Sequence, residues 1–95
     1  MDLYPATPGY ILVLPKQHIE NIYNMPDELG GHTMKVTVKL SRAVKRQLSQ
    51  DGLNLVQANE PAAGQNIPHF HLHIIPRYKD DTIILRFGYG SIPAS

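Results

Sequence analysis

Three histidines alternate with large apolar residues in the stretch PHFHLHIIPR, residues 68–77. Strict alternation is typical of a β-strand, in which residues i, i+2 and i+4 share one face. The pattern predicts a strand over 69–75 that turns its imidazoles to one side and Phe70, Leu72 and Ile74 to the core. With 5 histidines in 95 residues, about 0.01 such triplets are expected by chance, so the row indicates a function.

The overall composition is that of a single soluble domain without a strong charge bias. A formal net charge of +1 gives no concentrated basic field for nucleic acid or a membrane surface. The chain has no cysteine, which excludes disulfides and thiolate metal sites, and no apolar run approaches the roughly 18 residues of a membrane span. We therefore expect one cytoplasmic domain over residues 1–95, with neither nucleic acid nor a membrane as partner.

The other elements follow from apolar spacing and turn residues. A β-rich run at 10–14 predicts a strand, and Asn24 as a possible cap, followed by Pro26 and two acids, marks a helix start. Strand-like and helical spacings compete over 33–49, and length favours the helix. Further strands are predicted at 53–56 and 82–87, with a loop at 57–68 and a Gly/Pro-containing tail at 88–95. Together they predict an α+β domain, an antiparallel sheet with one main helix on one face.

Metal binding is one chemistry that suits a row of imidazoles. A His-x-His pair on a strand can begin a zinc site, but the outer rings, His69 and His73, lie about 13 Å apart at ~3.3 Å per residue. Residues 75–78 offer no carboxylate as a further ligand. A metal-dependent enzyme using one His-x-His pair stays as an alternative, and no metal ligand is assigned.

Phosphoryl or nucleotidyl transfer is the chemistry we favour. A phosphate carries several oxygens, so a row of N–H donors fits it better than it fits a point ion. Neutral imidazole is a competent nucleophile and can form a covalent phosphoramidate that water later hydrolyses. The central ring is flanked on both sides, which nominates His71 as the nucleophile and His69 and His73 as orienting or charge-stabilising groups. These donors can stabilise the phosphate charge, so no cofactor or divalent metal is required.

The loop ahead of the histidines contains groups that suit a phosphate or a ribose. Gly64 would allow close approach of the backbone to a ligand, and Gln65 and Asn66 would supply amide donors. An ordinary polar loop is the alternative. The position of the loop directly before the histidine strand favours the functional interpretation.

The motif at 69–75, His-apolar-His-apolar-His-apolar-apolar, resembles that of the histidine triad (HIT) family, in particular its HINT-like bacterial type. The similarity covers most of the chain, including residues 2–16, Asn59, the Gly-Gln-Asn at 64–66 and the Ile-Pro-Arg at 75–77. It implies a HIT-like fold and a nucleotide hydrolase or transferase of phosphoramidase or dinucleoside polyphosphate hydrolase type. It also implies a purine nucleotide as substrate, adenosine in the first place, and a homodimer.

The resemblance implies roles for individual residues. His71 would carry the nucleotidyl group, with His69 and His73 beside it. Asp2 would bind the ribose hydroxyls, and Leu3 would lie beside the base. The remaining ribose and phosphate contacts are implied for Asn59, Gly64, Gln65 and Asn66.

Three features depart from the family pattern. Tyr10 stands where the family usually has a histidine, and a phenol can donate or accept a hydrogen bond but carries no positive charge. Asn66 replaces a common hydroxyl residue, and the chain begins later than family members do, which we expect to leave an apolar surface under-covered. His18 and His32 are interpreted as non-catalytic. A nucleotide-binding or interaction protein with little catalysis on the same fold is the nearest alternative to the enzyme.

Overall fold

The computed structural model describes residues 8–81 in full and the backbone of 84–87 and 90–93. One long helix and several short antiparallel strands make up the described part, which confirms the predicted α+β class. In the part of the chain that is described, no helix has the length and apolar character needed to cross a membrane. In chain order the elements are β1 (Ile11–Val13), η1 (Ile22–Asn24), α1 (Asp27–Gln47), β2 (Gly52–Val56), η2 (Pro61–Ala63), β3 (Leu72–Arg77), β4 (Ile84–Phe87) and β5 (Gly90–Pro93).

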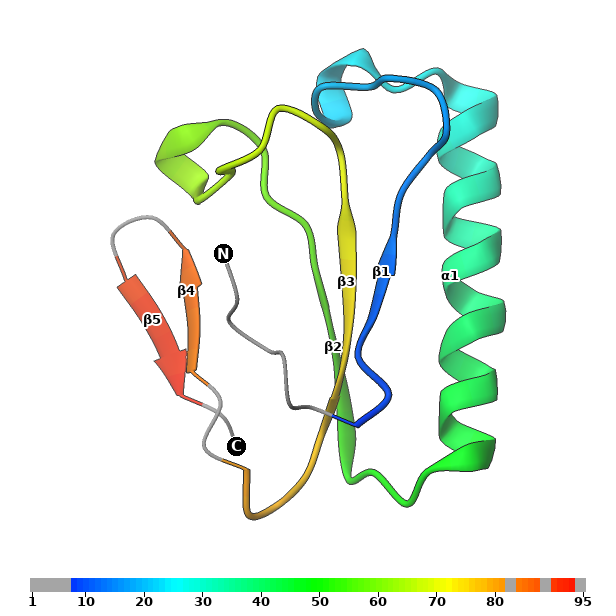
Figure 1. Cartoon of the computed structure of the whole chain (residues 1–95), viewed down its shortest axis with the longest axis vertical. Helices are drawn as coiled ribbons and strands as arrows, with labels where there is room; N and C mark the ends of the chain where they lie inside the picture. Colours follow the sequence, from blue (N-terminus) through cyan, green and yellow to red (C-terminus); the bar gives the residue numbers. More distant parts are fainter. Residues whose placement is uncertain (1–7, 82–83, 88–89, 94–95) are drawn as a thin grey trace.

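Three strands form an antiparallel sheet in the order β1-β3-β2, so the strand that begins within the histidine row is the central one. β1 and β2 pair with β3 from opposite edges, and Leu12 and Val56 both lie opposite His73. In Figure 1, α1 lies along one side of this sheet and the β4–β5 hairpin lies on the other side.

The core fills the space between α1 and the sheet. Directly paired residues point to the same face, so Ile11 and Val13 of β1 lie beside Ile74 and Leu72 of β3. Phe70, Leu72 and Ile74 each keep an exposed fraction of 7% or less, and they cluster with apolar side chains of β1, α1 and β2. The apolar face predicted for the histidine stretch is therefore confirmed.

Helix α1 begins later than the predicted cap implies. Pro26 occupies the cap position, and no side chain there accepts a hydrogen bond from the first turn. The predicted cap at Asn24 is wrong, because Asn24 ends the short helix η1 and the chain needs two more residues to enter α1. The first turn contains the acids Asp27 and Glu28, as expected. Their negative charges interact favourably with the positive end of the helix dipole.

Helix α1 continues without a break to Gln47. This confirms the prediction that residues 33–49 are mainly helical rather than a strand. Its buried face is partly polar, since Thr33 and Thr37 are buried together with Val44. Each threonine hydroxyl donates to the carbonyl oxygen four residues earlier, at 2.8 Å, which satisfies it inside the helix. Hydroxyls bonded in this way can face the sheet without an unpaired polar group.

Strand β3 begins at Leu72 and runs through Pro76, so the predicted strand at 69–75 is displaced toward the C-terminus. The carbonyl of Arg77 faces β2, where it accepts from the Asp51 N–H at 2.9 Å. Its neighbour Pro76 therefore faces the β1 side, on which pairing with β1 extends only to Ile74. The proline is tolerated in a central strand because its missing N–H faces no ladder partner in β1.

The C-terminal part adds a hairpin. Strand β4 lies within the predicted strand at 82–87, of which 82–83 fall outside the described residues. Strand β5 pairs with β4 and lies inside the segment that the sequence predicts as a tail, 88–95.

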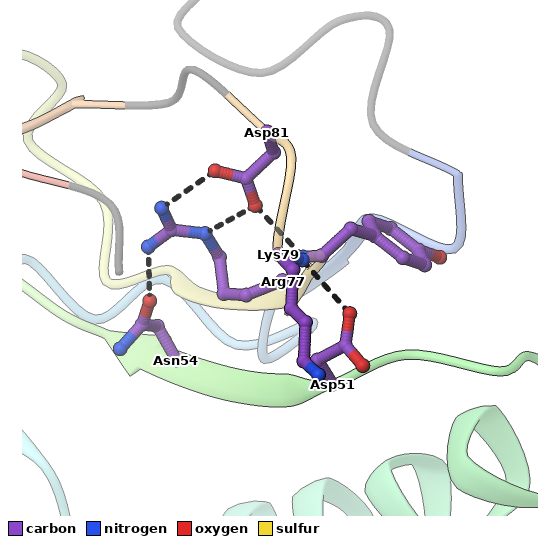
Figure 2. A network of polar contacts seen from close by, with 6 residues as sticks. Asp51, Asn54, Arg77, Lys79 and Asp81 are labelled. Atoms are coloured by element: carbon purple, nitrogen blue, oxygen red, sulfur yellow. Dashed lines mark hydrogen bonds and ion pairs between the residues drawn. The ribbon is translucent and has the colours of Figure 1, made fainter.

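A polar network closes the end of β3 against β2, as Figure 2 shows. The Arg77 guanidinium donates to both carboxylate oxygens of Asp81 and to the Asn54 side-chain oxygen. The same carboxylate accepts from the Tyr78 N–H at 2.8 Å. These contacts fix the turn that leaves the sheet, at the end of β3 opposite the histidines.

Candidate active site

The three histidines lie at the start of β3 rather than along it. Only His73 belongs to the strand, while His69 and His71 precede it. Ahead of the strand, the Phe70 N–H donates to the Ile19 carbonyl at 2.6 Å. The alternation nevertheless persists, since all three imidazoles are partly exposed and the apolar residues between them are buried.

A backbone contact selects one tautomer of the neutral His71 ring. Its Nδ1 lies 2.8 Å from the carbonyl oxygen of His69. A carbonyl oxygen can only accept, so Nδ1 carries the proton, and in the neutral ring Nε2 carries the lone pair. This geometry makes Nε2 of His71 a base or a nucleophile.

His73 lies at right angles to His71, with ring centroids 4.9 Å apart and an interplanar angle of 78°. Its Nδ1 lies 2.5 Å from the hydroxyl oxygen of Tyr10. Burial, and to a lesser degree the neighbouring His71, lower the pKa of His73 to about 4. The ring of His73 is therefore neutral at physiological pH.

His69 contacts the segment that follows β1. Its Nε2 lies 3.2 Å from the carbonyl oxygen of Pro15, so Nε2 carries the proton of the neutral ring. The His18 ring meets the His69 ring edge-on, with centroids 5.5 Å apart. This neighbour could not be predicted from the sequence, because the two residues are far apart in the chain. His32 lies on the exposed side of α1.

The amides of the preceding loop are engaged by the chain itself. Asn59 accepts from the Ile22 N–H at 2.8 Å and exchanges hydrogen bonds with the Gln57 side chain. Gln65 is buried, accepts from the Glu60 N–H at 2.6 Å and donates to the carbonyl of Glu20 at 2.6 Å. Both side chains position the loop, and their predicted contacts with substrate stay predictions.

Two residues of this loop have a positive φ. Glu60 has a φ of 72° and Gly64 a φ of 98°, at the two ends of the short helix η2. Gly64 adopts this conformation without strain, whereas a residue with a Cβ does so at a cost. The bond from the Glu60 N–H to Gln65 holds the strained position. The conformation of the loop is therefore defined by its own hydrogen bonds.

A cleft of about 550 Å³ lies beside the loop, between residues 20–21 and residues 60–68. Asn66 is exposed and lines this cleft together with Gln65. The volume is within the range of small-molecule sites. The remaining predicted site residues, Asp2 and Leu3, lie outside the described residues.

Among the residues described by the structure, no three His, Asp or Glu side chains are grouped so that they could hold a metal ion. A metal held by two of the imidazoles stays an alternative.

The fold and the site define an α+β protein with a row of imidazoles at the start of its central strand. The chain belongs to the HIT domain family, whose sequence model matches residues 1–80. It is 42% identical over 93 residues to Protein hit of Bacillus subtilis, a match that covers 97% of this chain and 60% of that protein. It is also 32% identical over 84 residues to a bis(5'-adenosyl)-triphosphatase of Saccharomyces cerevisiae, which covers 87% of this chain and 41% of the yeast protein.

Solved structures show the same fold. A crystal structure of a HIT family protein from Bacillus anthracis is 37% identical, with a TM-score of 0.76, and the match covers 94% of this chain and 60% of that one. A HIT family protein from Bacillus subtilis matches with a TM-score of 0.75 and 40% identity, over 90% of this chain and 57% of that chain. The chain thus spans between 41% and 60% of the length of these relatives.

Proposed function

We propose that this chain carries the reaction centre of a nucleotide hydrolase or nucleotidyl transferase, with His71 as the nucleophile. The observation that carries the proposal is the 2.8 Å contact between His71 Nδ1 and the His69 carbonyl oxygen. It commits the proton to Nδ1 and leaves the lone pair of Nε2 for attack on phosphorus. Membership of the HIT domain family supports the same chemistry.

The reaction would proceed in two balanced steps. Nε2 of His71 forms a bond to the α-phosphorus while the bond from phosphorus to the leaving group breaks, and the leaving group keeps that electron pair and takes a proton from water. Water, or another acceptor, then attacks the phosphorus of the nucleotidyl-histidine and releases its proton to solvent, while the N–P bond breaks and its electron pair returns to Nε2. His73 would stabilise the charge that develops on the phosphate oxygens, and His69, whose carbonyl oxygen lies 2.8 Å from His71 Nδ1, would orient the nucleophile.

The substrate class follows from the family and from one relative. We propose a purine nucleotide, adenosine in the first place, whose phosphate is linked through a phosphoramidate or a phosphoanhydride. Support comes from the similarity to a protein named bis(5'-adenosyl)-triphosphatase. Asn66, which lines the cleft, would face the leaving group, while Asp2, Leu3, Asn59, Gly64 and Gln65 would serve the ribose, base and phosphate sides.

The setting of the enzyme is also proposed. We expect a homodimer in the cytoplasm that requires neither a cofactor nor a metal ion. The absence of cysteine from the sequence is compatible with a reducing compartment. The donors of the triad and the loop would supply the charge stabilisation that a metal supplies in other phosphoryl-transfer enzymes.

Trapping of the intermediate tests the proposal. The protein is mixed briefly with adenosine phosphoramidate or a diadenosine polyphosphate, quenched and measured by intact-protein mass spectrometry. We expect the mass of one adenylyl group on His71 and turnover that chelators do not change. His71→Ala should lose both, whereas His32→Ala, on the exposed side of α1, should keep both. Nucleotide binding without an adduct or turnover would favour a non-catalytic binding protein, and turnover that a chelator removes would favour a metal enzyme.

A further inference from the structure

The contact between Tyr10 and His73 gives the site a feature beyond the row of histidines. The Tyr10 hydroxyl oxygen lies 2.5 Å from Nδ1 of His73, and the two rings are nearly parallel, with an interplanar angle of 13°. Tyr10 immediately precedes β1, and β1 pairs Leu12 with His73. The register of the sheet therefore brings the phenol to this imidazole.

The direction of this hydrogen bond follows from the chemistry of the two groups. A phenol has an ordinary pKa near 10, so it keeps its proton at neutral pH. An imidazole nitrogen with a lone pair is a stronger acceptor than a phenol oxygen. The pKa of His73, lowered to about 4 by burial and by His71, keeps this ring neutral and its lone pair present. The Tyr10 hydroxyl is thus the donor, and Nδ1 of His73 is the acceptor.

Acceptance at Nδ1 decides the state of the other nitrogen. A neutral imidazole has one N–H, so the proton of His73 lies on Nε2. In His71 the order is reversed, because its Nδ1 donates to the His69 carbonyl and its Nε2 has the lone pair. The two rings, with centroids 4.9 Å apart, thus differ at Nε2. In His71 this nitrogen is a base, and in His73 it is a hydrogen-bond donor.

We propose that Tyr10 is a positioning residue that fixes His73 as the Nε2–H tautomer, and so makes its Nε2 a hydrogen-bond donor beside the nucleophile. Its catalytic meaning rests on the function proposed above. A phenol suits the role because it donates without bearing a positive charge. The neutral Nε2–H tautomer of His73 then already has an N–H to donate, so the ring needs no further proton from solvent.

The tautomer can be measured without substrate. Two-bond ¹H–¹⁵N correlation spectra of ¹⁵N-histidine-labelled protein at pH 7 distinguish the Nε2–H from the Nδ1–H form of each ring. We expect His73 in the Nε2–H form, and a mixture of forms in Tyr10→Phe, which removes only the hydroxyl. Tyr23→Phe is the matched control, since Tyr23 is 74% exposed, and it should leave the His73 signals unchanged. Thermal melting verifies that each variant is folded.

Kinetics then test whether the tautomer serves the reaction. Tyr10→Phe should lower kcat by about 10-fold to 100-fold, the range typical of residues that orient a functional imidazole, with little change in KM. Tyr10→His, which restores an N–H donor, should recover part of the loss. An Nδ1–H form of His73 in the wild type, or identical His73 signals in Tyr10→Phe, would overturn the proposal. The spectra test whether Tyr10 positions His73 even if the protein turns over no nucleotide. A lack of turnover would count against the proposed function and not against the role of Tyr10.

Discussion

The guanidinium of Arg77 and the carboxylate of Asp81 face each other in a bidentate pair, with both N–O distances at 2.9 Å. The side chains are only 7% and 11% exposed. A third donor, Nη1, binds the oxygen of Asn54 on β2 (Figure 2). The pair therefore joins the turn after β3 to the neighbouring strand within a shielded environment.

Removal of the carboxylate should destabilise the fold. Asp81→Ala removes the carboxylate that faces the largely buried Arg77 guanidinium, and loss of one member of such a pair costs about 3 kcal/mol or more. The free energy of unfolding, measured by urea denaturation, should therefore fall by about 3 kcal/mol. Asp80→Ala is the control, because Asp80 is exposed, and it should change the value by less than about 0.5 kcal/mol. Equal effects of the two changes would show that the pair does not stabilise the protein.

Two glycines should respond to alanine in opposite directions. Gly9 has a φ of 80°, and a Cβ there would collide with the side chain of Leu48 and lie 3.2 Å from Pro76. Gly9→Ala should therefore cost about 1–3 kcal/mol. Gly31 lies in α1 with open space around its Cβ position, so Gly31→Ala should stabilise by about 0.5–1 kcal/mol. Melting curves of both variants measure the difference, and a stabilising Gly9→Ala would contradict the close approach.

The sequence alone predicts the local part of this architecture. The alternation around the triad places Phe70, Leu72 and Ile74 in the core, because a side-chain period of two is a local property of extended backbone. The long helix is predictable for the same reason, since its apolar spacing persists over several turns.

Contacts between distant segments could not be predicted in this way. The start of β3 depends on the bond from Phe70 to Ile19, and the surroundings of the triad depend on Tyr10 and His18. The sequence shows that Gln65 is an amide suited to a ligand, but only the tertiary structure shows that the loop itself uses this amide. Residue type limits the possible partners, and the fold selects among them.

The buried amide of Gln65 should be needed for an ordered loop. Its oxygen accepts from the Glu60 N–H, and its nitrogen donates to the carbonyls of Glu20 and Ile67, at 2.6 and 3.0 Å. Gln65→Ala leaves these backbone groups without this partner, which costs about 1–3 kcal/mol of stability. We expect a raised KM for nucleotide as well, because the loop borders the cleft. Gln17→Ala, at an exposed position, is the control, and hydrogen exchange of residues 59–66 reports the loosening directly.

The stability of the protein should depend on pH through His73. Its pKa is lowered to about 4 in the folded chain, whereas the ordinary value of 6.5 applies once the chain is unfolded. Between these values the unfolded chain binds more protons, so the free energy of unfolding falls as the pH drops from about 6.5 to about 4. Above pH 6.5 both states are neutral at this ring, and the contribution is constant. Because the ring is partly exposed, we expect a loss of about 1 kcal/mol rather than the full value of the shift.

Urea denaturation of the wild type and two variants between pH 7.5 and pH 4 separates this contribution from the other titrating groups. His73→Gln removes the titrating ring, so its stability should fall less over this interval than that of the wild type. His32→Gln replaces an exposed histidine on α1 and should follow the wild-type curve. If the wild type and His73→Gln lost stability equally, His73 would titrate alike in the folded and unfolded chains. The neutral ring that accepts the Tyr10 hydroxyl would then be lost near pH 6.5 rather than near pH 4.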